Sequence, residues 1–289
     1  MRNIVICFCI VLLVLLILLM RKQNKNKPKC ISVTTKGRLG NHFFEIISAW
    51  AYAKKYNINF VLSRDYSKKY KKYYDKYFNG IRLEDVNDGL FGSFEKKNYS
   101  CYDDISGIKP VAYKDCILID GFLQNSKNFN RYRDDVLKTF FNIKSIKPAN
   151  NKFFIHIRLT DFKTSKTHNL DLSNYYKKAI SYLQTRVDFN KIVMYVVSDD
   201  IVEARKQSYL SMFPSKSLVF IDNNEYDDIK TLELFKECCG GAIIGHSTFS
   251  WWGAYIINCP TKIVVCPNKF LTEDEDYSGL YLNYKVIDV

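Results

Sequence analysis

The pattern of apolar and polar positions predicts a regular alternation of strands and helices in the second half of the chain. Apolar runs short enough for buried strands fall at 152–158, 191–197, 217–221, 241–244 and 262–265. Segments with helical spacing fall at 173–186, 200–212, 226–238 and 248–258. Repeated alternation of this kind is typical of a parallel sheet with helices on both faces.

The first half repeats this alternation less regularly. Apolar runs predict strands at 30–35, 59–62 and 116–120, and helical patterns cover 42–56 and a segment ending near 141. Residues 79–114 are predicted to be irregular, and the linker 142–151 contains Pro148. We therefore predict an α/β protein with two Rossmann-like domains, 30–150 and 151–289, which face each other across a cleft.

An apolar run of 17 residues, Ile4 to Met20, precedes these domains and is at the short limit for spanning a bilayer. No small-x-small cleavage site is evident before the basic tract that follows, which favours an uncleaved signal anchor. Residues 1–29 are thus predicted to form a cytoplasmic tip, a membrane anchor at 4–20 and a short linker. The basic flank, read by the positive-inside rule, would favour the opposite orientation.

Composition and charge exclude few classes of protein. Apolar residues make up 47% of the 289 residues and aromatic residues 15%, as expected for a globular protein. The formal charge of +13 suggests an anionic partner without choosing among nucleic acid, nucleotide and membrane. The lysine- and tyrosine-rich stretch 64–78 is predicted to be a solvated face, with an acidic acceptor or a membrane surface as alternatives.

The cysteines and histidines predict no metal site. None of the nine cysteines forms a C-x-x-C pair, and the four histidines lack metal-ligand spacing. Seven cysteines lie outside the apolar run, so at least one thiol stays unpaired or pairs between chains. Disulfides are expected if the domain is lumenal, without a defined pairing.

The clearest chemical pattern follows the strand at 152–158. His156 and Arg158 share a face because residues two apart on a strand point the same way, and Asp161 follows in the turn. An open α/β sheet builds nucleotide sites at such strand ends. Arginine suits phosphate because its planar guanidinium donates two parallel hydrogen bonds and keeps its charge.

Three further segments carry polar groups at predicted turns. Ser198, Asp199 and Asp200 either orient a ribose, a base or a sugar, or only cap the next helix. The run Ser247-Thr248-Phe249-Ser250 opens a helix, whose free N–H groups favour an anion. The turn at 37–41, with Gly40 and Asn41, is a weaker signal of the same kind. Trp251 and Trp252 either pack the domain or line a sugar site.

Taken together, these motifs resemble the α-1,2-fucosyltransferases, glycosyltransferase family 11. The resemblance rests on four blocks that occur in the family's order: Gly37-Arg38-Leu39-Gly40-Asn41, Gly121-Phe122-Leu123-Gln124, His156-x-Arg158-x-x-Asp161 and Ser247-Thr248-Phe249-Ser250-Trp251-Trp252-Gly253-Ala254. The sequence departs from the family at two positions. Leu159 replaces the second of two adjacent arginines, and His42 replaces the usual glutamine.

The resemblance implies a GT-B-like fold and transfer of L-fucose from GDP-β-L-fucose, with inversion, to the 2-hydroxyl of a galactose-terminated glycan, with no required metal. It implies that Arg158 holds the pyrophosphate, that Ser247 and Thr248 cradle its oxygens, and that Asp199 or Asp200 lies near the guanosine. The general base is expected among Asp161, His156 and Glu45. For a eukaryotic chain, the family implies a type II anchor and a catalytic domain in the Golgi lumen, where Asn98, in the only N-x-S/T sequon, would be glycosylated.

Several alternatives remain open at this stage. Leu159 leaves room for another donor or acceptor, or for a non-catalytic glycan-binding protein. A GT-A enzyme would need a D-x-D motif after a strand, and the only candidate, Asp274-Glu275-Asp276, has no predicted strand directly before it. Nucleic-acid binding is not expected, because only the stretch 64–78 combines basic and aromatic residues.

Overall fold

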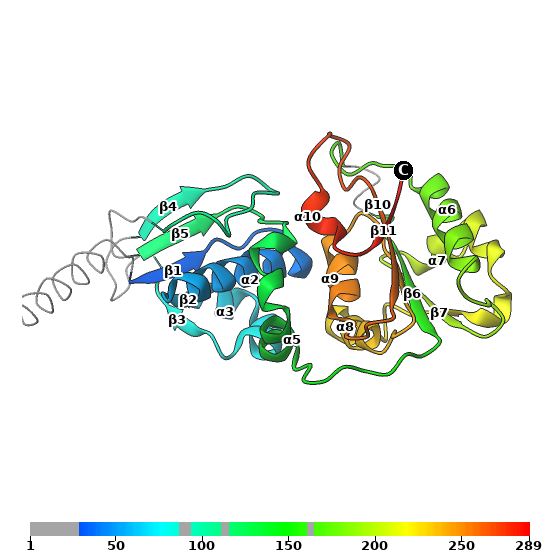
Figure 1. Ribbon diagram of the computed structural model, residues 1–289, viewed down its shortest axis with the longest axis horizontal. Helices are drawn as coiled ribbons and strands as arrows, with labels where there is room; N and C mark the ends of the chain where they lie inside the picture. The colour runs from blue at the N-terminus through cyan, green and yellow to red at the C-terminus, as the bar shows by residue number, and fades with distance from the viewer. Residues whose placement is uncertain (1–28, 87–93, 111–115, 161–164) are drawn as a thin grey trace, which may run out of the picture.

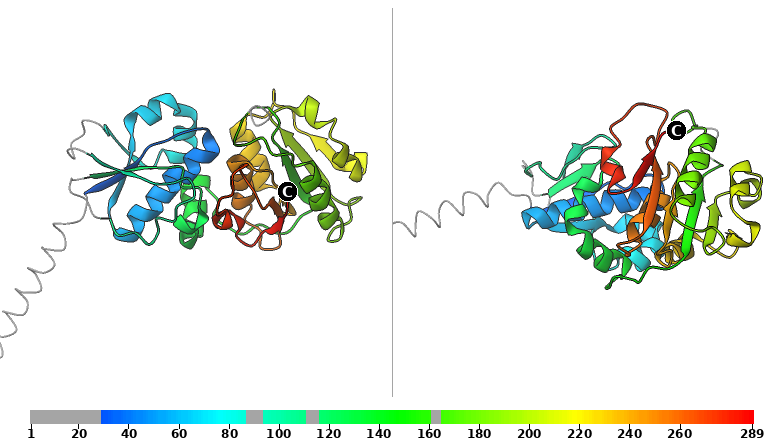
Figure 2. Two further views of the ribbon diagram at one scale, coloured as in Figure 1. Left: turned by 90° about the horizontal axis from the view of Figure 1, so that it is seen from above. Right: turned by 45° about the vertical axis from the view of Figure 1, so that its right-hand side comes forward.

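The computed structural model describes residues 29–86, 94–110, 116–160 and 165–289 (Figure 1). The predicted anchor at 4–20 and Asp161 lie outside these ranges. Within them, no helix is both long enough and apolar enough to cross a membrane. The described residues form two parallel β-sheets with helices packed against them, and Figure 2 shows the two units side by side. The predicted α/β class is confirmed.

The first sheet has five parallel strands in the order β3-β2-β1-β5-β4. Its strands are β1 (Cys30–Val33), β2 (Asn59–Ser63), β3 (Arg82–Glu84), β4 (Phe94–Asn98) and β5 (Cys116–Asp120). The prediction that residues 79–114 are irregular is wrong at β3 and β4. These strands lie at the two edges of the sheet, where short and largely polar strands leave no apolar run to mark them.

The helices of the first half are α2 (Leu39–Tyr56), α3 (Arg64–Lys69), α4 (Lys71–Tyr73), the π-helix η1 (Tyr74–Phe78), the 3₁₀ turns η2 (Ser126–Asn128) and η3 (Asn130–Tyr132), and α5 (Arg133–Phe141). Helix α2 begins at Leu39 rather than at the predicted residue 42. Gly40 and Asn41 therefore lie in its first turn and not in a loop. The helix ends at Asn57, whose positive φ of 53° is a conformation that asparagine tolerates at a helix end.

The second sheet has six parallel strands in the order β11-β10-β9-β6-β7-β8. They are β6 (Lys152–Ile157), β7 (Val193–Ser198), β8 (Leu218–Phe220), β9 (Gly241–Ile243), β10 (Ile263–Pro267) and β11 (Lys285–Ile287). Read from β8, this is the strand order of a dinucleotide-binding Rossmann sheet, 3-2-1-4-5-6. The chain therefore reverses direction across the sheet between β6 and β9, which is where such sheets bind ligands.

The helices around this sheet are α6 (Ser173–Gln184), α7 (Ile201–Ala204), η4 (Ser208–Met212), η5 (Ser215–Ser217), α8 (Asp228–Lys236), α9 (Thr248–Ile256) and α10 (Ser278–Tyr281). The single helix predicted at 200–212 is wrong, because α7 ends at Ala204 and a separate 3₁₀ segment follows. Strand β11 was not predicted. It is a short edge strand at the C-terminal end of the chain.

The stretch 64–78 is helical and its lysines are exposed, so the prediction of a solvated face is confirmed for its basic residues. Its apolar members Tyr66, Tyr77 and Phe78 are buried. Two of its lysines bind acids of α8 in the other half of the molecule: Lys72 lies 2.7 Å from Asp228, and Lys76 lies 3.0 Å from Glu233. Tyr66 and Tyr77 are therefore core residues, and Lys72 and Lys76 connect the two units.

The main core spans both units and is centred on Trp251 and Trp252 of α9. Both side chains are fully buried. The Trp252 ring stacks on Phe129 at 5.1 Å and lies 5.4 Å from Phe43 of α2. Helix α9 of the second half thus packs on helix α2 of the first (Figure 1). Core packing, the first of the two predicted roles for the tryptophans, is confirmed.

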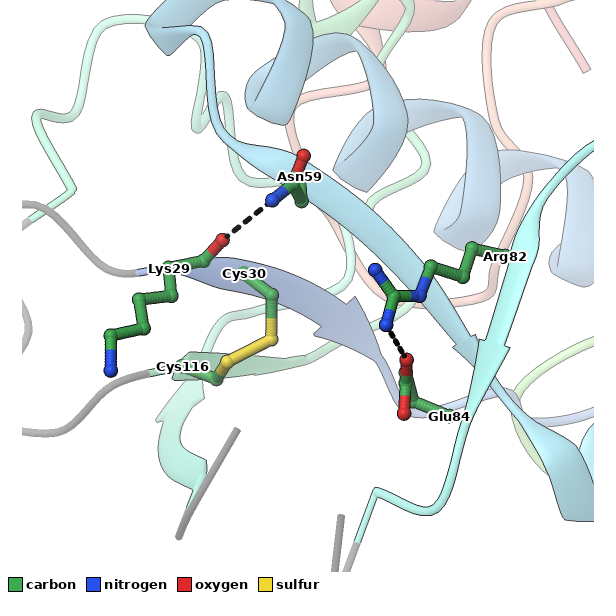
Figure 3. Close-up of a disulfide and its surroundings, with 6 residues drawn as sticks. All are labelled: Lys29, Cys30, Asn59, Arg82, Glu84 and Cys116. Atoms are coloured by element: carbon green, nitrogen blue, oxygen red, sulfur yellow. Dashed lines mark hydrogen bonds and ion pairs between the residues drawn. A yellow bond between two sulfur atoms is a disulfide. The ribbon is translucent and has the colours of Figure 1, made fainter. Parts of the chain in front are cut away.

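A disulfide joins Cys30 of β1 to Cys116 of β5, two paired positions at the beginning of both strands (Figure 3). The disulfide therefore lies at the amino ends of these central strands, whereas the site lies at the carboxyl ends. Cys101, Cys238, Cys239, Cys259 and Cys266 are free thiols. The prediction that at least one thiol stays unpaired is confirmed.

Candidate active site

A cavity of about 820 Å³ lies between the two sheets, at the carboxyl ends of their central strands. Its wall combines the start of α2 and the segment after β5 with the segments after β6, β7 and β9. These segments flank the reversal points of both sheets, between β1 and β5 and between β6 and β9. The cleft between two Rossmann-like sheets matches the GT-B-like arrangement that the resemblance predicts.

Two helices point their N-termini at this cavity. Neither α2 nor α9 has a side-chain cap or an acidic residue in its first turn, within the residues that the structure describes. The two starts also touch. A methyl group on Gly40 would lie 2.6 Å from the backbone nitrogen of Phe249. Two converging helix N-termini concentrate N–H donors and positive potential at one point, which suits a bound anion.

Arg158 lies at the end of β6, on the cavity wall, and its guanidinium is held by Asp199. The Nε atom of Arg158 lies 3.2 Å from the Asp199 carboxylate. The same carboxylate accepts hydrogen bonds from the backbone N–H groups of Leu159, at 2.8 Å, and Thr160, at 3.0 Å. Asp199 therefore orients both the arginine and the loop after it.

The contacts of Asp199 set its charge. Partial burial works to raise the pKa of Asp199, but the hydrogen bonds from Thr160 and Leu159 and the charge of Arg158 lower it below its ordinary value. The carboxylate stays ionised at neutral pH.

Leu159 packs against the apolar cluster beneath the sheet and is not part of the cavity wall. The position where the family has its second arginine thus faces away from the cavity here.

His156 is almost completely buried and lines the cavity two residues before Arg158. Its Nδ1 atom has no hydrogen-bond partner among the described residues. Burial lowers the pKa of His156 to about 4, so the imidazole is neutral at physiological pH. A buried ring nitrogen without a partner is costly, and a bound ligand would satisfy it.

The remaining predicted donor-binding residues divide into wall residues and supporting residues. Asn41, Ser198, Ser247, Thr248 and Phe249 line the cavity together with Gly40. Asp200 instead caps α7, where it accepts a hydrogen bond of 2.9 Å from the Glu203 N–H group. The Ser250 hydroxyl is fully buried and donates to the Ser247 carbonyl at 2.9 Å.

Glu45 and Asn98 lie away from the cavity wall. Both carboxylate oxygens of Glu45 accept the backbone N–H of Lys36 at 3.1 Å, which holds the turn before α2. Burial raises the pKa of Glu45 to about 9, so it is protonated at neutral pH. Asn98 is the exposed last residue of the edge strand β4.

The structure also brings to the site residues that sequence reasoning did not single out. Tyr70 and Tyr73 line the cavity, and the Tyr73 hydroxyl donates to the Asp228 carboxylate across the cleft. His42 also lines the cavity, with its ring 4.5 Å from that of Tyr70. His42 was visible in the sequence only as a departure from the family motif, and nothing local marked Asp228.

Within the described residues, no group of three or more histidine, cysteine or acidic side chains is arranged to hold a metal ion. The site is built from helix N-termini, two arginines (Arg38 and Arg158), buried neutral histidines such as His156, and aromatic side chains. This combination suits a diphosphate attached to neutral, ring-shaped groups.

Comparison with protein families agrees with this site. The model described as Glycosyl transferase family 11 matches residues 5–279. The chain belongs to this family of glycosyltransferases.

Curated relatives come from bacteria among other sources. The O-antigen biosynthesis glycosyltransferase WbnK of Escherichia coli is 28% identical, over 64% of this chain and 66% of its own length. The alpha-1,2-colitosyltransferase of Escherichia coli is 29% identical, over 63% of each chain. The chain thus spans slightly less than two thirds of the length of these two relatives.

Two solved structures show a weak likeness to this chain. NodZ alpha-1,6-fucosyltransferase soaked with GDP-fucose is 13% identical, with a TM-score of 0.48 over 80% of this chain and 93% of that chain. FUT1 of Arabidopsis thaliana in complex with GDP is 12% identical, with a TM-score of 0.44 over 80% of this chain and 69% of that chain. A likeness below a TM-score of 0.5 assigns neither ligand nor activity to this chain.

Proposed function

We propose that this protein is an inverting glycosyltransferase that moves L-fucose from GDP-β-L-fucose to the 2-hydroxyl of a galactose-type acceptor. The observation that carries the proposal is the convergence of the α2 and α9 N-termini beside Arg158, at the reversal point of a Rossmann-type sheet. That arrangement suits the diphosphate of a nucleotide sugar. Two relatives are named as an O-antigen biosynthesis glycosyltransferase and an alpha-1,2-colitosyltransferase, which supports glycosyl transfer as the class of reaction.

In the proposed reaction, the acceptor hydroxyl oxygen forms a bond to the anomeric carbon. The bond from that carbon to the β-phosphate oxygen breaks, and its electron pair leaves with GDP. Negative charge then develops on the β-phosphate. Arg158 and the N–H groups at the start of α9 would stabilise that charge without a metal, and fixed donors of this kind are worth roughly 2.7–4 kcal/mol each in other enzymes.

The acceptor proton needs a destination, and we assign it to His156. Among the described residues proposed as bases, His156 lines the cavity, whereas Glu45 lies outside it and is protonated at neutral pH. A histidine with a pKa of about 4 is a weak base. It therefore suits a transition state in which the bond to GDP is largely broken before the proton leaves. Asp161 remains a candidate from outside the described residues.

A second candidate donor is favoured by one specific observation. A relative that is 29% identical is named an alpha-1,2-colitosyltransferase. A different donor sugar in the same cleft would leave the roles of Arg158 and α9 unchanged. A binding protein without transfer activity is the further alternative.

The test uses purified full chain with a panel of GDP- and UDP-sugars, including GDP-fucose and GDP-colitose, and galactose-terminated acceptors in the presence of EDTA. Transfer from GDP-fucose that is insensitive to EDTA supports the main proposal. Transfer from GDP-colitose alone supports the second candidate. Turnover that requires a divalent metal, or transfer from UDP-sugars only, contradicts both.

We also propose a location for the enzyme: the Golgi lumen, with the segment 4–20 as a type II anchor, if the chain is eukaryotic. The Cys30–Cys116 disulfide supports an oxidising compartment, and Asn98 is exposed on an edge strand. A glycosidase-sensitive mass shift that is lost in Asn98→Gln would support this location. Absence of the shift, together with reduced Cys30 and Cys116 in protein taken from cells, would contradict it.

A further inference from the structure

The reversal point of the second sheet divides the cavity into two sides. In a sheet of this order, the nucleoside lies over the half made of β6, β7 and β8. The rest of the ligand extends over the half made of β9, β10 and β11. Asn223, Tyr226 and Asp228 line the cavity on the β7–β8 side, whereas Phe270 and Leu271 line it after β10. With the diphosphate at the start of α9, the sugars of the proposed reaction lie on the β10 side.

Contacts between the two units show which part of the first sheet faces each side. On the nucleoside side, Tyr73 binds Asp228. On the β10 side, the ring of Tyr102 lies 5.0 Å from that of Tyr277. A methyl group on Gly279 of α10 would lie 2.3 Å from Oδ1 of Asn125. The segment after β5 therefore faces the β10 side, where η2 contacts α10.

The backbone of the segment after β5 places two side chains, Phe122 and Gln124, on the cavity wall. Leu123 adopts a positive φ of 52°, which is rare for a branched residue, and its side chain is fully buried. Its neighbours on both sides, Phe122 and Gln124, line the cavity. The conformation is held by hydrogen bonds from the Gln124 N–H to the Cys101 carbonyl, at 2.6 Å, and from the Asn125 N–H to the Leu123 carbonyl, at 2.7 Å.

We propose that Phe122, Gln124 and Tyr102 form the acceptor subsite and that they bind the pyranose ring of the acceptor. Aromatic rings cover the apolar face of a sugar ring, and an amide binds its hydroxyl groups. The Gln124 amide donates to Oδ1 of Asn41 at 3.3 Å, which orients its carbonyl oxygen as an acceptor for a sugar hydroxyl. This inference rests on the proposed function, because it needs a nucleotide-sugar donor at the start of α9.

Two lysines near the subsite are held by Asp120. Lys36 lies 5.9 Å from the centre of the Phe122 ring, but its ammonium group pairs with Asp120 at 2.5 Å. Lys96 pairs with the same carboxylate at 2.6 Å. Two ammonium groups thus share a single carboxylate, and one positive charge is left over at this strand end.

The test compares steady-state kinetics of the full chain with those of Phe122→Ala and Gln124→Ala. The acceptors are p-nitrophenyl glycosides of galactose, glucose and N-acetylglucosamine. We expect each variant to raise the acceptor KM about tenfold. In Phe122→Ala, which leaves the contacts of Asn41 in place, the donor KM and the Kd for GDP should stay within about twofold of the wild-type values. Lys127→Ala, an exposed residue of η2 on the same segment, is the matched control and should change none of these values.

The outcomes separate this inference from the proposed function. If the wild-type protein transfers sugar but the variants keep its acceptor KM, the subsite is elsewhere and only this inference fails. A parallel rise of the donor KM or the GDP Kd in Phe122→Ala would place Phe122 at the donor instead and would also overturn it. If the folded wild-type protein neither binds GDP nor transfers sugar, the proposed function fails and this inference fails with it.

Discussion

The hydroxyl of Thr248, the first residue of α9, donates a 2.8 Å hydrogen bond to Oδ1 of Asn41 in the first turn of α2. This contact joins residues 207 positions apart in the sequence. It holds together the two helix N-termini that we assign to the donor diphosphate, so the geometry of the anion site depends on how closely the two units pack.

The first prediction concerns this packing at Gly40. A Cβ atom there would lie 2.7 Å from the backbone carbonyl carbon of Thr248, and backbone cannot move aside as a flexible side chain can. Gly40→Ala should separate the helix starts and weaken GDP binding about tenfold or more, measured by calorimetry. Gly80→Ala, where nothing lies within 4 Å of the added atom, is the control. Unchanged GDP affinity in Gly40→Ala would show that the two helix starts do not act together.

The second prediction concerns charge on the leaving group. Arg158→Ala should lower kcat about 100- to 1000-fold, because it removes a fixed cation from the developing phosphate charge. Arg158→Lys should recover only part of the rate, since lysine lacks the planar fork. Arg186→Ala, whose guanidinium packs on Tyr182 away from the cavity, is the control. Near wild-type kcat in Arg158→Ala at saturating donor would refute the mechanism.

The third prediction concerns the orienting role of Asp199. Asp199→Asn should lower kcat/KM about tenfold, because it weakens the hold on Arg158 and on the N–H groups of Leu159 and Thr160. If Asp199 acts through Arg158, the same substitution should add little in an Arg158→Ala background. Additive effects in this double-mutant cycle would mean that Asp199 contacts the substrate on its own account.

The fourth prediction concerns stability and pH through Glu45. Burial raises its pKa from 4.5 unfolded to about 9 folded, so between these values the folded protein binds more protons than the unfolded one. The stability that Glu45 contributes is complete below pH 4.5 and declines as the pH rises toward 9. Urea denaturation at several pH values should show that Glu45→Gln is less sensitive to pH across this window. Parallel curves for both proteins would contradict the shifted pKa.

The fifth prediction concerns the disulfide between Cys30 and Cys116, which closes a long stretch of chain. Replacing both cysteines by serine should lower the free energy of unfolding by about 2–5 kcal/mol. Reducing agent should destabilise the wild-type protein by a similar amount and leave the double variant unchanged. If reductant shifts both proteins equally, the stabilisation comes from elsewhere.

The sequence determined the strands of the central core and the residues at their ends. Buried parallel strands such as β6 and β7 are short apolar runs, and the polar residues that follow them lie at the site because parallel strands end at one edge of a sheet. His156, Arg158 and the start of α9 were therefore predictable. The edge strands β3, β4 and β11 were not, because their stability comes from pairing with a neighbour rather than from an apolar run of their own.

Only the tertiary structure decided how these local elements meet. Periodicity contains no information about strand order or the packing of distant helices, so the contact of Gly40 with Thr248 could not be read from it. The same holds for the roles of carboxylates. Asp199 and Glu45 were both plausible site residues by type, yet Asp199 holds Arg158 while Glu45 is buried beneath a turn. A side chain's charge and role depend on burial and partners, which residues far away in the sequence supply.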